Sequence, residues 1–374
     1  MIYLIIGSYA PNTAATNRFM GLLKAFSERN IDVTVCFFMS DENNSKAPDL
    51  PHVTYKYYWN QYNPKIVKLK LLFYLVYATQ FVHSLKYGDV IYAYNCNEIL
   101  SSLVSKRGVR VYHERTEHPL VSKLKVLNVR KYLKACKAVD GLFVISNPLK
   151  EYFCSIGVDR SKVYIVNMTV DATRFNGLTK RNCTKYIAYC GNGSNNKDGV
   201  DQLIKAFSIT TQSHPDVKLY IIGPMPKKFD SSGNLELIEK LGLSSKVIFT
   251  GIVSSSDIPQ ILKNAQVLAL NRPDNVQAKY GFPTKLGEYL LAGNPVVVTS
   301  VGDIPLFLKN KETALLAEPS NPEHFSNQLN WALDNYEDAL AIGQQGRQVA
   351  LTSFNSDSEA LKIIKVITQN DQLF

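Results

Sequence analysis

Strand-like and helix-like segments alternate along this chain from end to end, and the alternation starts again after residue 180. Apolar, β-branched runs predict strands at 1–6, 31–38, 90–94, 109–113, 141–145 and 163–166, then at 185–189, 217–222, 246–249, 267–270, 295–299 and 314–317. Amphipathic runs predict helices at 17–29, 64–85 and 120–137, then at 200–210, 234–241, 258–264, 284–292, 322–335 and 339–352. Two such series predict an α/β protein whose two doubly wound, Rossmann-like domains face each other across a cleft.

The chain of 374 residues is long enough for two domains of ordinary size. A polar stretch at 176–184 is typical of a linker, so we expect a first domain at 1–175 and a second at 176–357. A last helix near 358–368 is then free to pack back onto the first domain. Because ligands of such sheets bind at the carboxyl ends of the strands, the cleft is the expected site.

The positive charge of the chain is concentrated in its first half. Residues 1–175 contain 23 Lys and Arg against 13 Asp and Glu, whereas the remainder contains 19 of each, so the whole net charge of +10 lies before residue 176. Part of this excess falls within one predicted helix, at Lys123, Lys125, Arg130, Lys131, Lys134 and Lys137. A basic amphipathic helix favours an anionic membrane surface or partner, and a solvated helix face is the equally open alternative.

A second feature of the sequence, the predicted helix 64–85, also leaves membrane association open. The predicted helix 64–85 contains the apolar stretch 71–77, which indicates either a buried helix or a segment that dips into a membrane surface. No run is long and apolar enough to cross a bilayer, and the stretch 1–7 lacks the basic n-region of a signal peptide. The six cysteines form no metal-ligand spacing. We therefore expect a cytoplasmic protein without a metal site, with peripheral attachment to the inner face of the cytoplasmic membrane left open.

The stretch 281–299 is the most informative about ligands. It predicts a loop, a helix that begins near Thr284 and ends before Gly293, and a buried strand. The free N–H groups of such a helix start bind anions, so the candidates for phosphate contact are Gly281, Phe282, Pro283, Thr284 and Lys285. Glu288 lies one turn deeper, where a carboxylate suits sugar hydroxyls better than phosphate. A phosphate and a polyol side by side indicate a nucleotide-sugar.

A second anion site is predicted ahead of the helix near residue 200. Gly191, Asn192 and Gly193 form a glycine-rich loop, and Lys197 follows it. The ammonium of Lys197 would meet a diphosphate at the helix tip and stabilise it as a leaving group, which makes this residue catalytic. The alternative interpretation is an ordinary exposed lysine.

In order along the chain, segments 167–175, 189–199, 219–224, 247–253 and 281–299 resemble the motifs of the retaining glycosyltransferases of family 4, which have the GT-B fold. The resemblance spans nearly the whole chain and is strongest after residue 160. It implies transfer of a sugar from a UDP- or GDP-linked donor, with retained anomeric configuration, without a metal or other cofactor. The implied acceptor is a saccharide or a polyprenyl-diphosphate-linked glycan in bacterial cell-surface polysaccharide biosynthesis.

The same resemblance assigns donor contacts and shows two departures from the family. Glu288 corresponds to the glutamate that binds the donor ribose, but the family's first glutamate falls on Tyr280, with backbone amides near Gly281 as the possible substitute. The family's arginine falls on Asn192, so Arg272 or Lys285 is needed as a second cation. Val253 would read the nucleobase edge, or else belongs to a tight turn.

In the first domain, the loop 7–16 joins the first strand to the first helix, and Thr13 lies where the family often has glycines near the acceptor. Arg18 faces an anionic ligand or is a surface arginine. His118 resembles the family's histidine that touches donor sugar or acceptor. Glu114 and Glu117 cluster with it at one strand end, where they could bind acceptor hydroxyls or act as base.

Two other functions compete with sugar transfer. The first is a GT-B nucleotide-sugar epimerase, against which the junction and phosphate-loop motifs argue. The second is a basic nucleic-acid-binding protein, which the charge favours but which lacks a recognisable module, so no nucleic-acid partner is expected. For transfer we predict a front-face displacement, in which a donor phosphate oxygen takes the acceptor's proton. The oligomeric state is not indicated by the sequence.

Overall fold

A computed structural model describes residues 1–11, 13–39, 43, 45–61, 67–94, 97–121, 126–181, 185–224 and 232–369. The chain divides into two compact units, unit 1 (Met1–Thr169 with Ser356–Phe374) and unit 2 (Val170–Asn355). The division therefore lies at 169/170 and 355/356, slightly before the expected boundaries at 175 and 357. Lys123 and Lys125 of the predicted basic helix, and the start of the predicted helix 64–85, lie outside the described residues.

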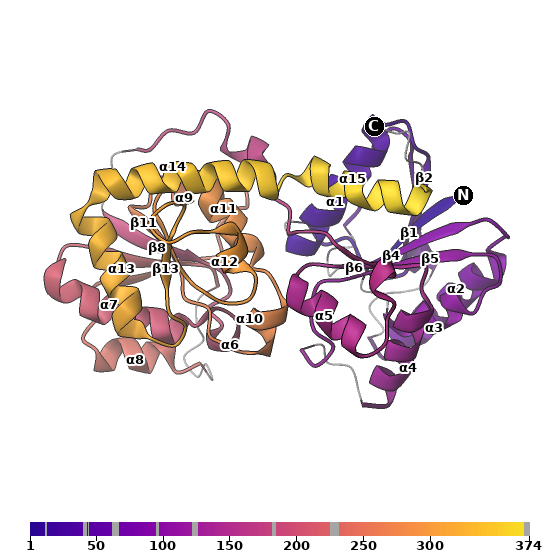
Figure 1. The fold of residues 1–374 in the computed structure, drawn as a ribbon, viewed down its shortest axis with the longest axis horizontal. Helices are drawn as coiled ribbons and strands as arrows, with labels where there is room; N and C mark the ends of the chain where they lie inside the picture. The colour runs from indigo at the N-terminus through magenta and orange to yellow at the C-terminus, as the bar shows by residue number, and fades with distance from the viewer. Residues whose placement is uncertain are drawn as a thin grey trace. The chain divides into compact units, whose positions relative to one another are not determined.

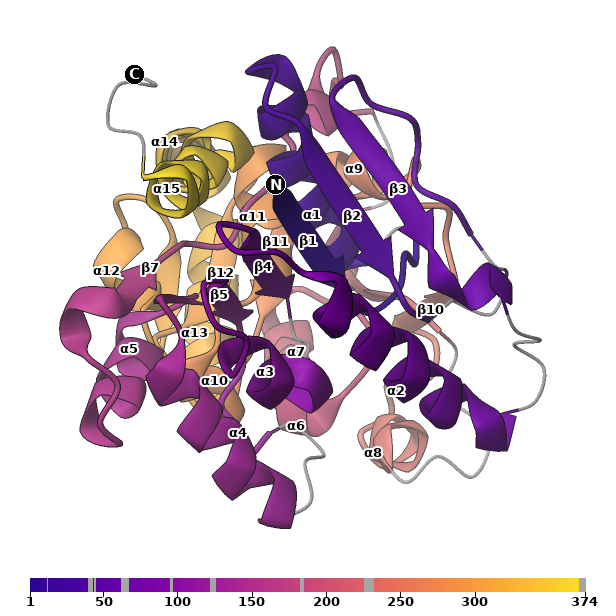
Figure 2. The same ribbon diagram turned by 90° about the vertical axis from the view of Figure 1, so that its right-hand side faces the viewer.

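Unit 1 is built on a seven-stranded sheet in which every strand pair is parallel (Figure 1). The strand order is β3-β2-β1-β4-β5-β6-β7, and the strands are β1 (Ile2–Ile6), β2 (Val33–Phe37), β3 (Val53–Tyr57), β4 (Val90–Tyr94), β5 (Arg110–Arg115), β6 (Gly141–Val144) and β7 (Val163–Ile165). The helices are α1 (Ala14–Glu28), α2 (Val67–Ser84), α3 (Asn97–Val104), α4 (Val126–Ala138), α5 (Asn147–Ser155) and α15 (Ser356–Thr368). Figure 2 shows β3, β2 and β1 side by side at one edge of this sheet.

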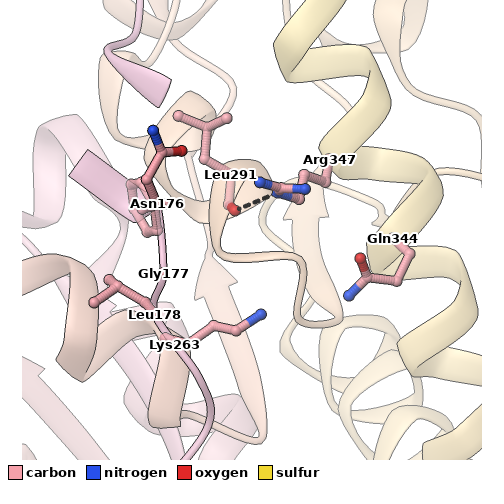
Figure 3. A pocket seen from close by; sticks show the side chains of 8 residues that line it. Asn176, Gly177, Leu178, Lys263, Leu291, Gln344 and Arg347 are labelled. Carbon is pink, nitrogen blue, oxygen red and sulfur yellow. Dashed lines mark hydrogen bonds between the residues drawn. The ribbon is translucent and has the colours of Figure 1, made fainter. Parts of the chain in front are cut away.

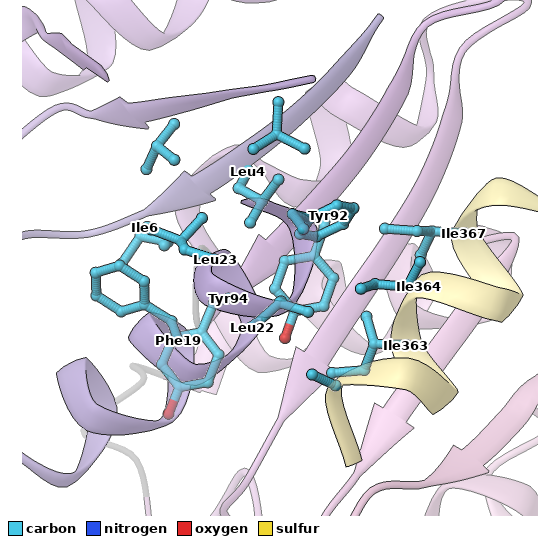
Figure 4. Packing of buried hydrophobic residues seen from close by; sticks show 14 of the residues in the cluster. Leu4, Ile6, Phe19, Leu22, Leu23, Tyr92, Tyr94, Ile363, Ile364 and Ile367 are labelled. Atoms are coloured by element: carbon cyan, nitrogen blue, oxygen red, sulfur yellow. The ribbon is translucent and has the colours of Figure 1, made fainter. Parts of the chain in front are cut away.

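The C-terminal helix α15 belongs to the core of unit 1. Its residues Ala360, Ile363, Ile364 and Ile367 recur at helical spacing and are buried together with Leu22 of α1 (Figure 4). Burying one isoleucine side chain contributes about 1.5–3 kcal/mol. Three of them are enough to fix a helix that joins its unit from the far end of the chain.

Unit 2 repeats the architecture with six parallel strands in the order β10-β9-β8-β11-β12-β13. The strands are β8 (Tyr186–Cys190), β9 (Lys218–Ile222), β10 (Val247–Gly251), β11 (Val267–Leu270), β12 (Val296–Thr299) and β13 (Leu315–Ala317). The helices are α6 (Asn195–Asp198), α7 (Val200–Ser213), α8 (Asn234–Lys240), α9 (Ile258–Asn264), α10 (Val276–Tyr280), α11 (Thr284–Ala292), α12 (Ile304–Phe307), α13 (Pro322–Asp334) and α14 (Tyr336–Ser353), and a 3-10 turn, η3, spans Ala172–Phe175. In both units the carboxyl ends of all strands lie at one edge of the sheet, where ligands of this fold class bind.

Candidate functional site

Three neighbouring strands of unit 2 end in glycine at the same edge of the sheet. Gly191 follows β8, Gly223 follows β9, and Gly251 is the last residue of β10. The Gly191 N–H donates to Ile222 O at 2.8 Å. A Cβ atom at Gly223, whose φ is +155°, would lie 1.8 Å from Gly191 O, so no side chain fits there. We call this part of the sheet, formed by Gly191, Gly223 and Gly251, the glycine edge. It exposes backbone without side chains, which a ligand can approach closely.

The N-terminus of α11 lies at the glycine edge. The backbone N–H of Cys190 donates to the Tyr289 hydroxyl at 2.6 Å, which ties the end of β8 to this helix. Pro283 is the N-cap of α11, and no side chain caps the helix, while Thr284 at its first position is exposed. The first-turn N–H groups and the positive end of the helix dipole are the elements of an anion site.

Lys285 places a cation against the glycine edge. Its ammonium donates to the Asp198 carboxylate at 2.5 Å, and a Cβ atom at Gly191 would lie 2.7 Å from its Nζ. Asp198 is buried and also accepts from the Tyr189 hydroxyl at 2.7 Å. Burial lowers the pKa of Lys285, Asp198 opposes this, and nearby Lys197 lowers it further. Two cations thus share one small region.

Lys197 is held by a short, well-capped helix. It lies in α6, where the Ser194 hydroxyl accepts from the Lys197 N–H at 3.2 Å and the Lys197 side chain is exposed. Asn192 is exposed too, and its Oδ1 accepts from the Ser194 N–H at 3.4 Å. Gly193 adopts φ +73°, a conformation that favours glycine. The loop is therefore fixed by local hydrogen bonds and leaves Lys197 accessible.

Arg272, the other expected source of a second cation, has a different position. Its side chain is buried, with Nε donating to Lys197 O and Nη2 to Gln277 O, both at 3.4 Å. Arg272 thus holds the backbones of α6 and α10 together by donating to one carbonyl group of each. Of the two candidates, Lys285 is the cation that lies against the glycine edge.

Glu288 is paired with an arginine that the sequence motifs did not single out as a site residue. The Arg174 guanidinium, in η3, donates through Nη1 to Glu288 Oε1 and through Nη2 to Ser255 O at 2.7 Å. The Glu288 side chain keeps 26% of its surface exposed, so the carboxylate is oriented without being sealed off. Arg174 lies within the junction motif 167–175, but its pairing crosses 114 residues of sequence and becomes visible only in the fold.

Two residues of the stretch before α11 serve the structure of unit 2. The Gly281 N–H donates to Gln277 O at 3.1 Å and so ends α10, which removes it as a substitute donor to the sugar. The Phe282 ring is buried 5.5 Å from the Phe307 ring and 5.4 Å from the Phe354 ring. Only backbone groups near Phe282 remain as ligand contacts.

The remaining two positions of interest at this end of the sheet are partly exposed. Val253 is half-buried just beyond Gly251, which has φ +73° in a bulged strand end, so both the turn and the base-reading interpretations remain compatible with its place. Tyr280 is half-buried, with the Lys279 ammonium 5.8 Å from its ring centroid. A tyrosine and a lysine therefore occupy the place of the family's first glutamate.

In unit 1, Arg18 and Glu114 form a buried ion pair with each other. The Arg18 Nε donates to Glu114 Oε1, and Tyr92 donates to the second carboxylate oxygen. Arg18 also donates to Val166 O at 3.1 Å and to Asn167 O at 2.5 Å. Since the Glu114 side chain is 1% exposed, the pair is a buried structural anchor, contrary to the expectation that both contact an acceptor.

Thr13 is the N-cap of α1. Its Oγ1 accepts from the Thr16 N–H at 3.2 Å, and the residue is exposed. This cap satisfies one of the N–H groups that a helix start leaves free. Thr13 thus fixes the start of α1 and remains accessible from solvent.

His118 and Glu117 follow β5 in unit 1. The His118 ring lies 4.1 Å from the Tyr152 ring, and its Nδ1 accepts from the Leu120 N–H at 3.2 Å. Burial and, after it, the charge of Arg115 lower the pKa of His118, so its imidazole is neutral at pH 7. The Glu117 backbone oxygen accepts from Arg115 Nε at 2.9 Å, and the residue is half-buried. Within the described residues, no group of three or more His, Cys, Asp or Glu side chains is arranged to hold a metal ion.

Residues 172–349, which lie within unit 2 and contain the whole glycine edge, match the family model "Glycosyl transferases group 1". These residues are just under half of the chain, and over them the chain is similar to the group 1 glycosyl transferases. This agrees with the family resemblance carried by the sequence motifs.

The curated relatives of this chain are distant. An uncharacterized glycosyltransferase of Methanocaldococcus jannaschii is 26% identical over 225 residues, which are 56% of this chain and 54% of the relative. The D-inositol 3-phosphate glycosyltransferase of Corynebacterium glutamicum is 25% identical over 172 residues, 45% of this chain and 40% of the relative. The chain thus spans about half, or less, of the length of the curated relatives it matches.

Among solved structures, the HepE protein of Anabaena has been determined in complex with UDP and with UDP-glucose. The UDP complex matches this chain with a TM-score of 0.76 at 17% identity, over 99% of this chain and 100% of that chain. The likeness confirms the predicted GT-B fold with its two Rossmann-like sheets. Among the described residues, no helix has the length and apolar character needed to cross a membrane.

Proposed function

We propose that this chain transfers a sugar from a nucleoside-diphosphate sugar, UDP- or GDP-linked, to a saccharide or lipid-linked acceptor in cell-surface polysaccharide biosynthesis. One observation carries the proposal: Lys197 and Lys285 lie with the uncapped start of α11 at the glycine edge. Glu288 is one turn further along the same helix. Unit 2 binds the donor, and unit 1 supplies the acceptor's contacts.

The charges suit a diphosphate with a sugar beside it. The site keeps a net positive charge for a sugar-linked diphosphate: Asp198 balances Lys285, while Lys197 and a helix start, with about half an elementary charge, remain. The carboxylate of Glu288 accepts hydrogen bonds from vicinal hydroxyls, and Arg174 holds it in place. UDP and UDP-glucose in the complexes of HepE support UDP as the first nucleotide to test.

The proposed chemistry retains the anomeric configuration. The bond between sugar C1 and the donor phosphate oxygen breaks while C1 bonds to the acceptor hydroxyl oxygen on the same face. The hydroxyl proton passes to an oxygen of the departing diphosphate, so no enzyme nucleophile is required. Lys197, Lys285 and helix N–H groups stabilise the leaving charge, and no step is assigned to a metal ion. The proposed contacts to the sugar or acceptor hydroxyls are Glu117 and His118, and the imidazole of His118 is neutral.

Calorimetric titration of the full chain with UDP, GDP and their sugars tests the donor site. One nucleotide is expected to bind, and Lys197→Ala or Glu288→Gln is expected to weaken its binding at least tenfold, about 1.4 kcal/mol. Lys246→Ala is the matched control, since Lys246 precedes β10 at the opposite end of that strand from Gly251. Binding that is equal in all four proteins would refute this assignment of the donor site.

We further propose that the protein associates peripherally with anionic membrane, where lipid-linked acceptors reside. Leu72, Leu75 and Val76 of α2 are 55%, 40% and 42% exposed, and their spacing puts them on one face of the helix. Unit 1 also contains most of residues 1–175, which hold all of the positive excess. Apolar side chains beside positive charge are typical of helices that lie in a membrane interface.

Liposome flotation tests this surface. The wild-type chain is expected to float with vesicles that contain anionic phospholipid and to remain at the bottom with neutral vesicles. A Leu72→Gln, Val76→Gln variant is expected to lose most of this binding, because its apolar contact area is removed. The control is Leu306→Gln, because Leu306 is an exposed leucine of unit 2. The membrane proposal would be refuted if the floating fraction were the same with neutral and anionic vesicles and were unchanged by the α2 substitutions.

A further inference from the structure

Unit 2 contains a polar pocket that is separate from the glycine edge. It has a volume of about 220 Å³ and lies between α9, the end of α11, α14 and the segment that follows η3 (Figure 3). Its polar lining comes from Asn176, Lys263, Gln344 and Arg347. Because α11 runs from Thr284 at the glycine edge to Ala292 here, the two sites lie at opposite ends of one helix.

Part of this lining caps α11. Lys263 Nζ donates to Ala292 O at 2.8 Å, Arg347 Nε to Leu291 O at 3.2 Å, and Gln344 Nε2 to Gly293 O at 2.8 Å. These carbonyl groups lie at the end of the helix, where no further N–H group is available to them. Capping alone therefore explains one hydrogen bond from each side chain, and it could be provided by neutral groups such as Gln344.

The pocket nevertheless has more positive charge than the helix end can balance. The C-terminus of a helix carries about −0.5 elementary charge, against two full charges on Lys263 and Arg347. Among the described residues, neither cation forms an ion pair with a carboxylate, as the ion pairs of unit 2 involve other lysines and arginines. Burial and, after it, the charge of Arg347 lower the pKa of Lys263, because each disfavours the charged ammonium.

The donors of the two cations are only partly used by the helix carbonyls. Arg347 contributes Nε to Leu291 O, the hydrogen bond marked in Figure 3, and its guanidinium carries two further nitrogens. An arginine fork with an adjacent ammonium is the donor set that matches the oxygen atoms of phosphate. The side-chain amide of Asn176 lines the pocket from the opposite side.

We propose that this pocket between α9, α11 and α14 is a binding site for a phosphate group, held by the Arg347 guanidinium and the Lys263 ammonium. The phosphate is either the free ion or part of a phosphomonoester, since the chemistry that recognises them is shared. The site is distinct from the donor site and does not depend on the proposed transfer reaction. A phosphate dianion there offsets the two positive charges, which repel each other, and leaves the capping hydrogen bonds in place.

Titration calorimetry with inorganic phosphate at constant ionic strength tests the site. The full chain is used with Lys197→Ala, so that phosphate contact at the donor loop is weakened. Saturable binding is expected, at least tenfold weaker after Lys263→Met, and weaker after Arg347→Lys, which keeps the charge but loses the fork. Lys309→Met is the control, because Lys309 is an exposed lysine of unit 2 paired with Glu312.

A second arm of the titration separates the two sources of phosphate. Glycerol 3-phosphate and glucose 1-phosphate are compared with inorganic phosphate, and tighter binding of an ester would identify a metabolite as the ligand. Circular dichroism checks that each variant is folded, and if Lys263→Met fails this check, Arg347→Lys provides the test. The proposal would be overturned if phosphate showed no saturable binding to the Lys197→Ala chain. It would also be overturned if that chain and its folded Lys263 and Arg347 variants bound phosphate equally.

Discussion

Replacing Lys285 with methionine is expected to lower kcat/KM for sugar transfer by about 10²–10³, the usual loss when one preorganised group that stabilises transition-state charge is removed. The reason is that Lys285 lies against Gly191, where we place the departing diphosphate. The same change is expected to destabilise unit 2 by about 3–5 kcal/mol, because it leaves the buried carboxylate of Asp198 without its cation. Transfer is measured with the nucleotide-sugar that calorimetry identifies.

A double substitution separates these two effects. Asp198→Asn combined with Lys285→Met removes both charges, and the asparagine can still accept from the Tyr189 hydroxyl. Stability is expected to return close to that of the wild type, whereas transfer stays as low as in Lys285→Met. The chain has two tryptophans, Trp59 in unit 1 and Trp331 in unit 2, so fluorescence in a Trp59→Phe background reports the unfolding of unit 2 alone.

The opposite pattern would assign Lys285 a structural role only. If transfer recovers along with stability in the double variant, the loss in Lys285→Met comes from the disturbed fold. Lys197 would then be left as the cation of the donor site.

Local signals in the sequence were sufficient for the helix that positions the site. The prediction of a helix at 284–292 is confirmed by α11, because Pro283 and Gly293 limit it from both ends without help from the rest of the fold. Gly293 adopts φ +70°, which ends a helix wherever it occurs. In contrast, β3 was missed, since its residues alternate between half-buried and exposed at the edge of the sheet. α5 was missed although Ser146 and Pro148 mark its start.

Pairings between distant residues were not predictable from the sequence. Lys285 and Asp198 are 87 residues apart, and Arg18 and Glu114 are 96 apart. In the sequence, Glu114 stands in a cluster of ionisable residues after a strand, which favours a functional site. Whether such a carboxylate meets an acceptor or a buried arginine depends on which helix packs over that strand. A single sequence does not contain this information.

The buried His113 is expected to make unit 1 unstable in acid. It is fully buried in β5, with Nδ1 donating to Ala93 O at 3.0 Å and Nε2 accepting from the Tyr132 hydroxyl at 3.2 Å, so the neutral ring satisfies both partners. Burial, with a further contribution from Arg115, lowers the pKa of His113 to about 3. An unfolded histidine binds a proton near pH 6.5, whereas the folded one stays neutral down to about pH 3.

Stability from His113 is therefore complete above pH 6.5 and is lost as the pH falls toward 3. Over this window the loss is on the order of 4–5 kcal/mol, with a slope near 1.4 kcal/mol per pH unit. His113→Gln is expected to lack this slope, because an amide can donate to Ala93 O and accept from the Tyr132 hydroxyl without titrating. Urea unfolding followed by Trp59 fluorescence in a Trp331→Phe background measures unit 1 at each pH. The exposed His83→Gln serves as the control and should keep the wild-type slope, and a parallel slope in His113→Gln would place the acid sensitivity elsewhere in unit 1.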